Sequence, residues 1–469
     1  MTTLIKGGTV VSATGADPAD VVIEGDKIVA VVAPGSSIAA SVEHNAEVLD
    51  AVGKYVIPGG VDVHTHMQLD VGTTTSSDTF ESGTTAAAWG GTTTIVDFVT
   101  QELGREVREC LDERFAEAEG NCAIDYGFHM ILGDVNDASL KVMDDLVDEG
   151  ITSFKLFMAY PGKLLSSDRQ ILQAMQNCAG NGAMMMMHAE NGIAIDLLAE
   201  QAIARGETEP VNHGIVRRHE LESEATHRAI KLAKVGASPL YIVHLSASGA
   251  LEEVARARNE GANVFAETCP QYLYLSLEEH LGAPGFEGAK YVCSTPLRSA
   301  HEHHHADLWK GLRANDLSVV STDHCPFCVK DQKDLGIDDF RAIPNGIGGV
   351  EHRMDLIYQG VVAGEITLPR WVELCSTTPA RMFGLYPQKG AIQPGADADI
   401  VLYDPNASWQ ISVDNHHMNM DYSAYEGFEV QGKVDTVMSR GKVIVQNDAF
   451  HGKPGDGKYL KRGLSQYLV

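Results

Sequence analysis

Residues 61–70 read VDVHTHMQLD, an apolar run that ends in two histidines, His64 and His66, one residue apart. Residues i and i+2 of a β-strand point to the same face, so we expect these two imidazoles to lie side by side. Such a pair suits a cation such as Zn²⁺, which binds imidazole nitrogen well. His-x-His pairs also occur as two surface or hydrogen-bonded histidines, so the remaining sequence has to decide between these interpretations.

The middle of the chain alternates apolar runs with longer amphipathic stretches such as residues 104–120 and 167–180. This alternation is typical of βα units around a parallel sheet, and eight strands with eight helices is the count of a TIM barrel. The methionines at 184–187 fit a strand that is buried on both faces. The eight runs that we predict as strands are residues 56–66, 92–98, 124–132, 152–160, 183–190, 239–246, 263–273 and 317–327.

Both ends of the chain have a different texture, with short strand-like runs separated by Gly, Asp and Pro turn signals and no helix pattern within the first 50 residues. We therefore predict that the two ends pair into one small β domain. The predicted division is residues 1–54 plus 386–450 for the β domain, 55–385 for the catalytic barrel, and 451–469 for a C-terminal tail that we expect at a subunit interface.

Composition excludes several classes of function. The chain has 469 residues, is 44% hydrophobic and carries a formal charge of −28, which disfavours nucleic acid as a partner. No apolar run approaches the roughly 20 residues that cross a bilayer. The start MTTLIKGGTVV does not resemble a secretion signal, so we expect a cytoplasmic protein. The eight scattered cysteines, including the CPFC pair at 325–328, are interpreted as reduced thiols without a metal role.

Potential metal ligands stand at the ends of five predicted strands, where the functional groups of such barrels lie. They are His64 and His66, Lys155, His188, His244 and Asp323. Four histidines and one aspartate suit Zn²⁺ better than Ca²⁺ or Mg²⁺. A buried lysine can deprotonate and react with CO₂ to form an anionic carbamate ligand, or it can pair with a carboxylate, and the residues alone leave both open. The cluster HEHHH at 301–305 opens a polar helical stretch and is expected to be exposed.

Seven segments resemble the hydantoinase and dihydropyrimidinase family of the cyclic amidohydrolases. They are VDVHTH, SFKLFMAY, MMHAEN, YIVHLS, VCSTPLR, STDHCPF and IPNGIGGVE, in this order. The resemblance implies a distorted (β/α)₈ barrel with a small β-sandwich, a binuclear Zn²⁺ centre, and a homotetramer or dimer. It implies that His64 and His66 bind the more buried metal, that His188 and His244 bind the more exposed one, that carbamylated Lys155 bridges both, and that Asp323 ligates the first.

The same resemblance implies hydrolytic opening of cyclic ureides and amides, 5,6-dihydropyrimidines and hydantoins, to N-carbamoyl amino acids. A hydroxide that bridges the metals attacks the ring carbonyl, Tyr160 stabilises the oxyanion, and Asp323 transfers the proton. Ser294 and Asn345 hold the imide-like edge of the substrate, although STPLR lacks a second proline that relatives often have after the serine. Four apolar residues, which we call the gate residues, surround the group on ring carbon 5: Leu69, Val71, Phe157 and Leu164.

Related enzymes and a non-catalytic homologue are the alternatives to this function. An allantoinase shares the barrel and the metal set and stays open. A dihydroorotase would need a cation shortly after the His-x-His pair, where Met67 and Gln68 stand, and a mononuclear deaminase would lack Lys155. A metal-free homologue with an assembly role would have lost ligands, whereas every expected ligand is present in this chain.

Overall fold

The middle of the chain forms a sheet of eight parallel strands that follow one another in sequence order. In the computed structural model, which describes residues 2–467, a bridge between Thr65 and His324 joins the two edges and nearly closes the barrel. This confirms the predicted (β/α)₈ barrel. Its strands are β6 (Gly60–Thr65), β7 (Thr92–Thr100), β8 (Asp125–Ile131), β9 (Ser153–Phe157), β10 (Met184–His188), β11 (Leu240–Ile242), β12 (Val264–Thr268) and β13 (Val319–Val320).

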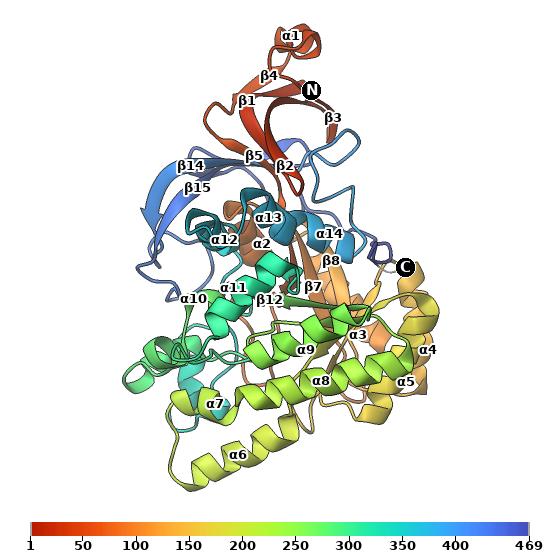
Figure 1. The fold of residues 1–469 in the computed structure, drawn as a ribbon, viewed down its shortest axis with the longest axis vertical. Coiled ribbons are helices and arrows are strands. Elements are labelled where there is room, and N and C mark those ends of the chain that lie inside the picture. The colour runs from red at the N-terminus through yellow and green to blue at the C-terminus, as the bar shows by residue number, and fades with distance from the viewer. Residues whose placement is uncertain (1, 468–469) are drawn as a thin grey trace.

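Helices surround this barrel (Figure 1). Their ends follow local sequence signals: Ser167 caps α5 in a capping box with Gln170, and Gly182 ends the helix in the left-handed conformation with φ 76°. They are α2 (Phe80–Trp89), α3 (Val107–Ala118), α4 (Asp137–Asp148), α5 (Asp168–Asn181), α6 (Gly192–Ala204), α7 (Val211–Val216), α8 (His219–Gly236), α9 (Ser248–Asn259), α10 (Pro270–Tyr274), α11 (His304–Ala314), α12 (Arg353–Val362), α13 (Leu368–Val372) and α14 (Thr378–Met382).

Shorter helical turns complete the connections between these elements. They are η1 (Leu277–Leu281), η2 (Gly285–Tyr291), η3 (Lys333–Gly336), η4 (Phe340–Ala342) and η5 (Glu373–Thr377). The strands that they and the helices surround are buried on both faces, as the methionine run of β10 requires.

The two chain ends form a second, mixed sheet, in which β5 pairs with β1 from the start of the chain and with β14 from its end. This confirms the predicted small β unit, while its proposed bounds and those of the barrel stay predictions. Its strands are β1 (Thr2–Ser12), β2 (Gly15–Glu24), β3 (Lys27–Val32), β4 (Glu47–Asp50), β5 (Tyr55–Pro58), β14 (Ile400–Gln410), β15 (Glu429–Ser439), β16 (Lys442–Gln446) and β17 (Ala449–Phe450).

Two details of the sequence prediction were wrong. The run 56–66 is divided between the sheets, because the chain leaves β5 at Pro58 and Gly59 donates its N–H to Asp399 O at 2.9 Å before β6 begins. A short helix, α1 (Ser37–Glu43), also interrupts the N-terminal strands. Its signal is the Ser36 side chain, which accepts from Ala39 N at 3.2 Å as an N-cap.

The segment after β17 returns to the barrel of its own chain. Leu460 donates its N–H to Tyr126 O at 2.7 Å, and the buried Arg462 donates to Ser153 Oγ at 2.8 Å. Leu460 and Arg462 therefore pack near the start of β8 and β9, opposite the strand ends that carry the predicted ligands. The predicted role of this tail at a subunit interface stays a prediction.

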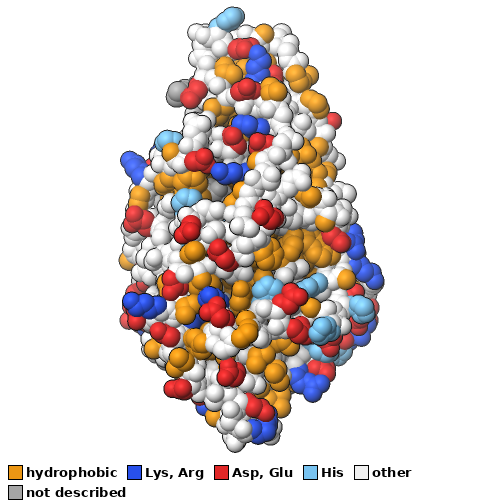
Figure 2. Space-filling model, turned by 90° about the vertical axis from the view of Figure 1, so that its left-hand side faces the viewer, with side chains coloured by type: hydrophobic (Ala, Val, Ile, Leu, Met, Phe, Trp, Pro, Cys, Tyr) orange, Lys and Arg blue, Asp and Glu red, His pale blue; other side chains and the backbone are white. Residues whose placement is uncertain are grey.

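The surface agrees with the acidic composition. Figure 2 shows acidic and basic side chains interspersed over the face in view, without a basic patch on that face. Among residues 2–467, no helix combines the length and the apolar character that a membrane crossing needs.

Candidate active site

The six predicted ligands come together at the C-terminal end of the barrel. His64 lies on β6 and His66 just after it, Lys155 lies within β9, and His188 ends β10. His244 and Asp323 follow β11 and β13 within three residues of the strand ends. All six are buried, none more than 9% exposed. We call them the donor cluster.

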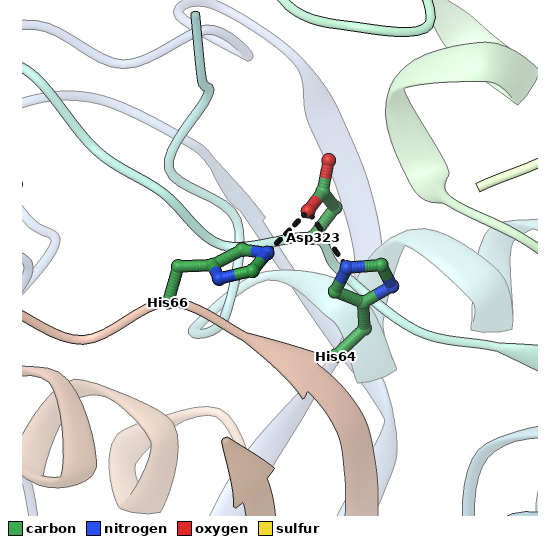
Figure 3. Close-up of side chains that lie close together, drawn as sticks. All are labelled: His64, His66 and Asp323. Atoms are coloured by element: carbon green, nitrogen blue, oxygen red, sulfur yellow. Dashed lines mark ion pairs between the residues drawn. The ribbon is translucent and has the colours of Figure 1, made fainter. Parts of the chain in front are cut away.

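An inner group forms around Asp323 (Figure 3). Its Oδ1 atom lies 3.1 Å from His64 Nε2 and 3.3 Å from His66 Nε2. Lys155 Nζ lies 3.0 Å from the same His64 nitrogen. The His-x-His pair thus points to one face, as the strand geometry predicts, and three residues of two metal-binding types, His64, His66 and Asp323, share one small space.

The outer group consists of His188 and His244. His188 Nδ1 lies 3.0 Å from His244 Nε2, and the His244 ring lies 5.4 Å from the His64 ring between centroids. The two groups therefore adjoin. The Phe157 ring stacks on His188 at 5.1 Å and closes the apolar side of the outer group.

Two buried carboxylates hold these histidines from behind. Glu267 pairs with His64 Nδ1 and also accepts from the Tyr241 hydroxyl at 2.8 Å. Glu190 accepts from His188 Nε2 at 2.7 Å and from Arg217 at 2.8 Å. Each carboxylate favours a proton on the ring nitrogen that it faces, so in a neutral His64 or His188 ring the other nitrogen presents a lone pair to the cluster.

Sequence reasoning missed Glu190, Arg217 and Glu267. Glu190 and Glu267 carried a usable signal, because each is a carboxylate inside an apolar strand run that ends at the barrel mouth. Arg217 carried none, since it reaches the site from the end of α7 and only the fold places it beside Glu190.

Burial controls the charges of the cluster. It lowers the pKa of Lys155 to about 8 and that of His66 to about 4, and it holds the pKa of His244 well below its ordinary value. Burial opposes the charge of Asp323, but His64 and the hydrogen bonds from His64 and His66 keep the pKa of that carboxyl well below its ordinary value. Burial also lowers the pKa of His188, so His66, His188 and His244 offer neutral nitrogens. Burial and Lys155 oppose the charge of His64, but the carboxylates of Glu267 and Asp323 raise its pKa. Imidazole nitrogens beside a carboxylate are a donor set suited to a divalent metal.

The turns after three strands hold their side chains in left-handed backbone conformations. The φ angles are 63° at Tyr160, 38° at His244 and 51° at Asp323. Non-glycine residues adopt such angles rarely, and they cluster at functional sites where the surrounding structure enforces them. These three residues are among those that the sequence singled out.

The predicted substrate residues lie beside the outer group. The Tyr160 ring is 5.4 Å from the His188 ring, and Asn345 Nδ2 donates to Ser294 Oγ at 3.1 Å. Burial raises the pKa of the Tyr160 hydroxyl, while Arg217 and hydrogen bonds with Ser294 and Asn345 oppose the rise. Tyr160 is therefore a protonated donor near Ser294 and Asn345.

The gate residues divide into two pairs. Phe157 is buried at the end of β9, and Leu164 packs against the same apolar cluster. Leu69 and Val71 are half-buried on the loop after β6, where Val71 N donates to Thr74 O at 3.0 Å. Leu69, Val71 and Leu164 therefore lie on the loops after the first and fourth barrel strands, whereas Phe157 is the last residue of β9. Their role as a gate stays a prediction.

The HEHHH cluster is exposed at His301, Glu302 and His303, as expected, but not at His304. His304 is buried, because its Nδ1 atom accepts the Ser248 N–H at 3.0 Å at the start of α9. It groups with Glu302 and His219, but an imidazole whose Nδ1 accepts that bond keeps its proton on Nε2, which donates to Glu302 at 2.6 Å. This nitrogen has no lone pair for a metal. The eight cysteines are free, as expected.

Comparison with known proteins identifies the family. Residues 55–444 match the amidohydrolase family model. A D-hydantoinase from Streptomyces coelicolor is 61% identical over 467 residues, which cover 100% of this chain and 99% of that protein. The chain belongs to the amidohydrolase family.

Within this family the chain is a cyclic amidohydrolase of the hydantoinase and dihydropyrimidinase branch. A D-hydantoinase from Ralstonia pickettii is 46% identical and is covered to 99%, with 98% of this chain matched. A dihydropyrimidinase structure from Brevibacillus agri superposes with a TM-score of 0.96 at 44% identity and 100% coverage of both chains. Membership in the amidohydrolase family also indicates use of a divalent metal, for which the inner group provides ligands.

Proposed function

We propose that this amidohydrolase opens 5,6-dihydropyrimidines and hydantoins by hydrolysis and releases N-carbamoyl amino acids. The convergence of the donor cluster from five strand ends carries the proposal, because no packing or folding requirement brings four histidines, a lysine and an aspartate into one buried space. The names of the relatives, hydantoinases and a dihydropyrimidinase, support the substrate class.

The residues fit two Zn²⁺ ions. In this proposal His64, His66 and Asp323 hold the more buried ion, His188 and His244 hold the more exposed one, and Lys155 bridges them as a carbamate. Support comes from the lone pair of His188 Nδ1, which faces His244 Nε2 at 3.0 Å, since a cation satisfies two such nitrogens at once. When bound, the two ions lower the pKa of a shared water and supply a hydroxide near neutral pH.

Lys155 is suited to carbamylation. Its ammonium lies over the Phe98 ring at 4.3 Å and beside His64, and burial lowers its pKa to about 8. The lowered pKa increases the fraction of neutral amine, which attacks CO₂, forms an N–C bond and loses a proton, and this leaves an anionic group with two oxygens. The modification thus replaces a cation by an anion at the centre of the donor cluster.

The chain's own groups then handle the proton and the substrate. Asp323 stays ionised, so it accepts a proton from the nucleophile and passes it to the leaving ring nitrogen. The Tyr160 hydroxyl donates to the carbonyl oxygen as it gains negative charge. Ser294 and Asn345 hold the opposite edge of the ring, largely through backbone N–H and C=O groups.

The gate residues favour unsubstituted or apolar groups at ring carbon 5. A carboxylate there would lose hydration without gaining a partner, at a cost of a few kcal/mol. An apolar group gains roughly 25 cal/mol per Å² buried. Dihydroorotate is therefore expected to be a poor substrate. The free cysteines suit a reducing compartment, so the proposal keeps a cytoplasmic location. The proposal also keeps the expectation that the protein is a homotetramer or a dimer.

A substrate panel tests the function. Purified protein with two equivalents of Zn²⁺ and bicarbonate is given dihydrouracil, dihydrothymine, hydantoin, 5-phenylhydantoin, allantoin and dihydroorotate, and ring opening is followed by loss of absorbance. The proposal expects turnover of the first four rings. Turnover of allantoin alone would replace it by the allantoinase alternative, and efficient opening of dihydroorotate would contradict the gate.

A further inference from the structure

Lys333 is a fully buried lysine outside the donor cluster. It is 0% exposed at the start of η3, and its ammonium donates to Val292 O at 3.2 Å and to Pro344 O at 3.0 Å. Burial lowers its pKa to about 7. Its partners are thus two backbone carbonyls rather than a carboxylate, although burying an ammonium in this way is costly. The contact of Lys333 with these two carbonyls therefore indicates a role beyond packing.

The two carbonyls lie next to the residues that we assign to the ring edge. Val292 stands two residues before Ser294, and Pro344 immediately precedes Asn345. Two hydrogen bonds also join the segments around Ser294 and Asn345. Gly346 N donates to Val292 O at 3.0 Å, and Asn345 Nδ2 donates to Ser294 Oγ at 3.1 Å. Lys333 is thus a third connection, placed behind the two side chains.

The neighbouring residue connects the same turn to the gate. Gln332 Nε2 donates to Thr74 Oγ1 at 3.0 Å and to Thr75 O at 2.6 Å, on the loop that carries Leu69 and Val71. Gln332 therefore contacts the loop that carries Leu69 and Val71, and Lys333 contacts the two segments that carry Ser294 and Asn345.

We propose that Lys333 is a positioning residue that fixes the spacing between Ser294 and Asn345 and thereby sets the affinity for the cyclic ureide. The proposal rests on the proposed function, which assigns the ring edge to these two residues. Two loop segments that must present complementary groups to a planar ring lose affinity when their spacing varies, and a single donor to both backbones suppresses that variation.

Lys333→Met tests this, because methionine keeps much of the apolar stem and removes the donors. We expect KM to rise roughly tenfold, with kcat changed by less than about threefold and two metals per chain retained, since the lost contact serves ring binding. Lys330→Met is the matched control, an exposed lysine on the same loop, and should behave as the parent. An unchanged KM in folded, metal-loaded Lys333→Met would overturn the proposal, as would a loss confined to kcat.

Amide hydrogen exchange gives a readout that does not depend on activity. Exchange in residues 292–298 and 343–347 should become faster in Lys333→Met and not in Lys330→Met. Unchanged exchange in Lys333→Met overturns the positioning role, whether or not the parent opens any ring. Failure of the parent to open any ring would instead count against the proposed function. If Lys333→Met does not fold, Lys333→Gln, whose side chain is one bond too short to reach both carbonyls at once, carries both measurements. A parental KM or parental exchange in that variant then decides against Lys333.

Discussion

The donor cluster and the gate residues lie at the same end of the barrel but are held in different ways. Every member of the donor cluster is buried on or directly after a strand, and His64 and His188 are also fixed by a carboxylate. Three of the four gate residues are half-buried and lie on loops. The comparison indicates that the chemistry depends on rigid strand ends, whereas substrate choice depends on segments that can change without disturbing the ligands.

Removal of Lys155 should have the largest effect. If Lys155 carries the proposed bridge, Lys155→Ala should lose most bound metal and lower turnover by about 10³-fold or more, because bound metals contribute several kcal/mol to such reactions. Metal analysis and ring-opening rates measure this, and short carboxylic acids should partly restore both. Lys141→Ala, an exposed lysine on α4, is the control. Two metals and full activity in Lys155→Ala would remove the bridge from the mechanism.

Asp323 tests whether the inner group does more than bind metal. Asp323→Asn keeps the shape of the side chain and should retain part of the metal, yet turnover should fall on the order of 10²-fold or more because the proton carrier is lost. Turnover per bound metal is the decisive quantity, with the exposed Asp338→Asn as control. Parental turnover per metal would leave Asp323 as a ligand alone.

Substitutions of Glu267 and Glu190 test the inner and the outer group of the donor cluster individually. Glu267→Gln and Glu190→Gln should each weaken metal binding about 10- to 100-fold, as loss of such partners usually does. Glu190→Gln should also lower the melting temperature more, because it leaves Arg217 buried without its anion. Chelator competition and thermal unfolding measure these effects, with the exposed Glu260→Gln as control. A melting temperature of Glu190→Gln equal to that of the parent would show that the pair of Glu190 with Arg217 adds no stability.

The gate should give the smallest effect on overall activity. Phe157→Ala removes an apolar ring that stacks on His188, so activity should shift among 5-substituted hydantoins by roughly tenfold or less while dihydrouracil turnover changes little. Ratios of kcat/KM across the panel report this. An equal loss on every substrate would place Phe157 in support of the donor cluster rather than in the gate.

The sequence predicted the features that one strand can encode. Each barrel strand was found because an apolar run ended in polar residues, and the six donors were found because they lie at those ends. Glu190 and Arg217 form a pair 27 residues apart, and Lys333 contacts a carbonyl 41 residues away, so their roles depend on contacts that only the fold creates. The buried state of His304 was missed for the same reason, since its partner Ser248 lies on another helix.

The pairing of β5 with β14 has a consequence for the order in which the protein matures on the ribosome. The strand at Tyr55–Pro58 leaves the exit tunnel long before its neighbour at Ile400–Gln410 is synthesised. During that interval one edge of β5 has no partner, and an open edge of this kind can pair with another nascent chain. The segment from residue 400 onward thus completes a sheet that residues 2–58 begin, so premature termination before residue 400 would release chains prone to self-association.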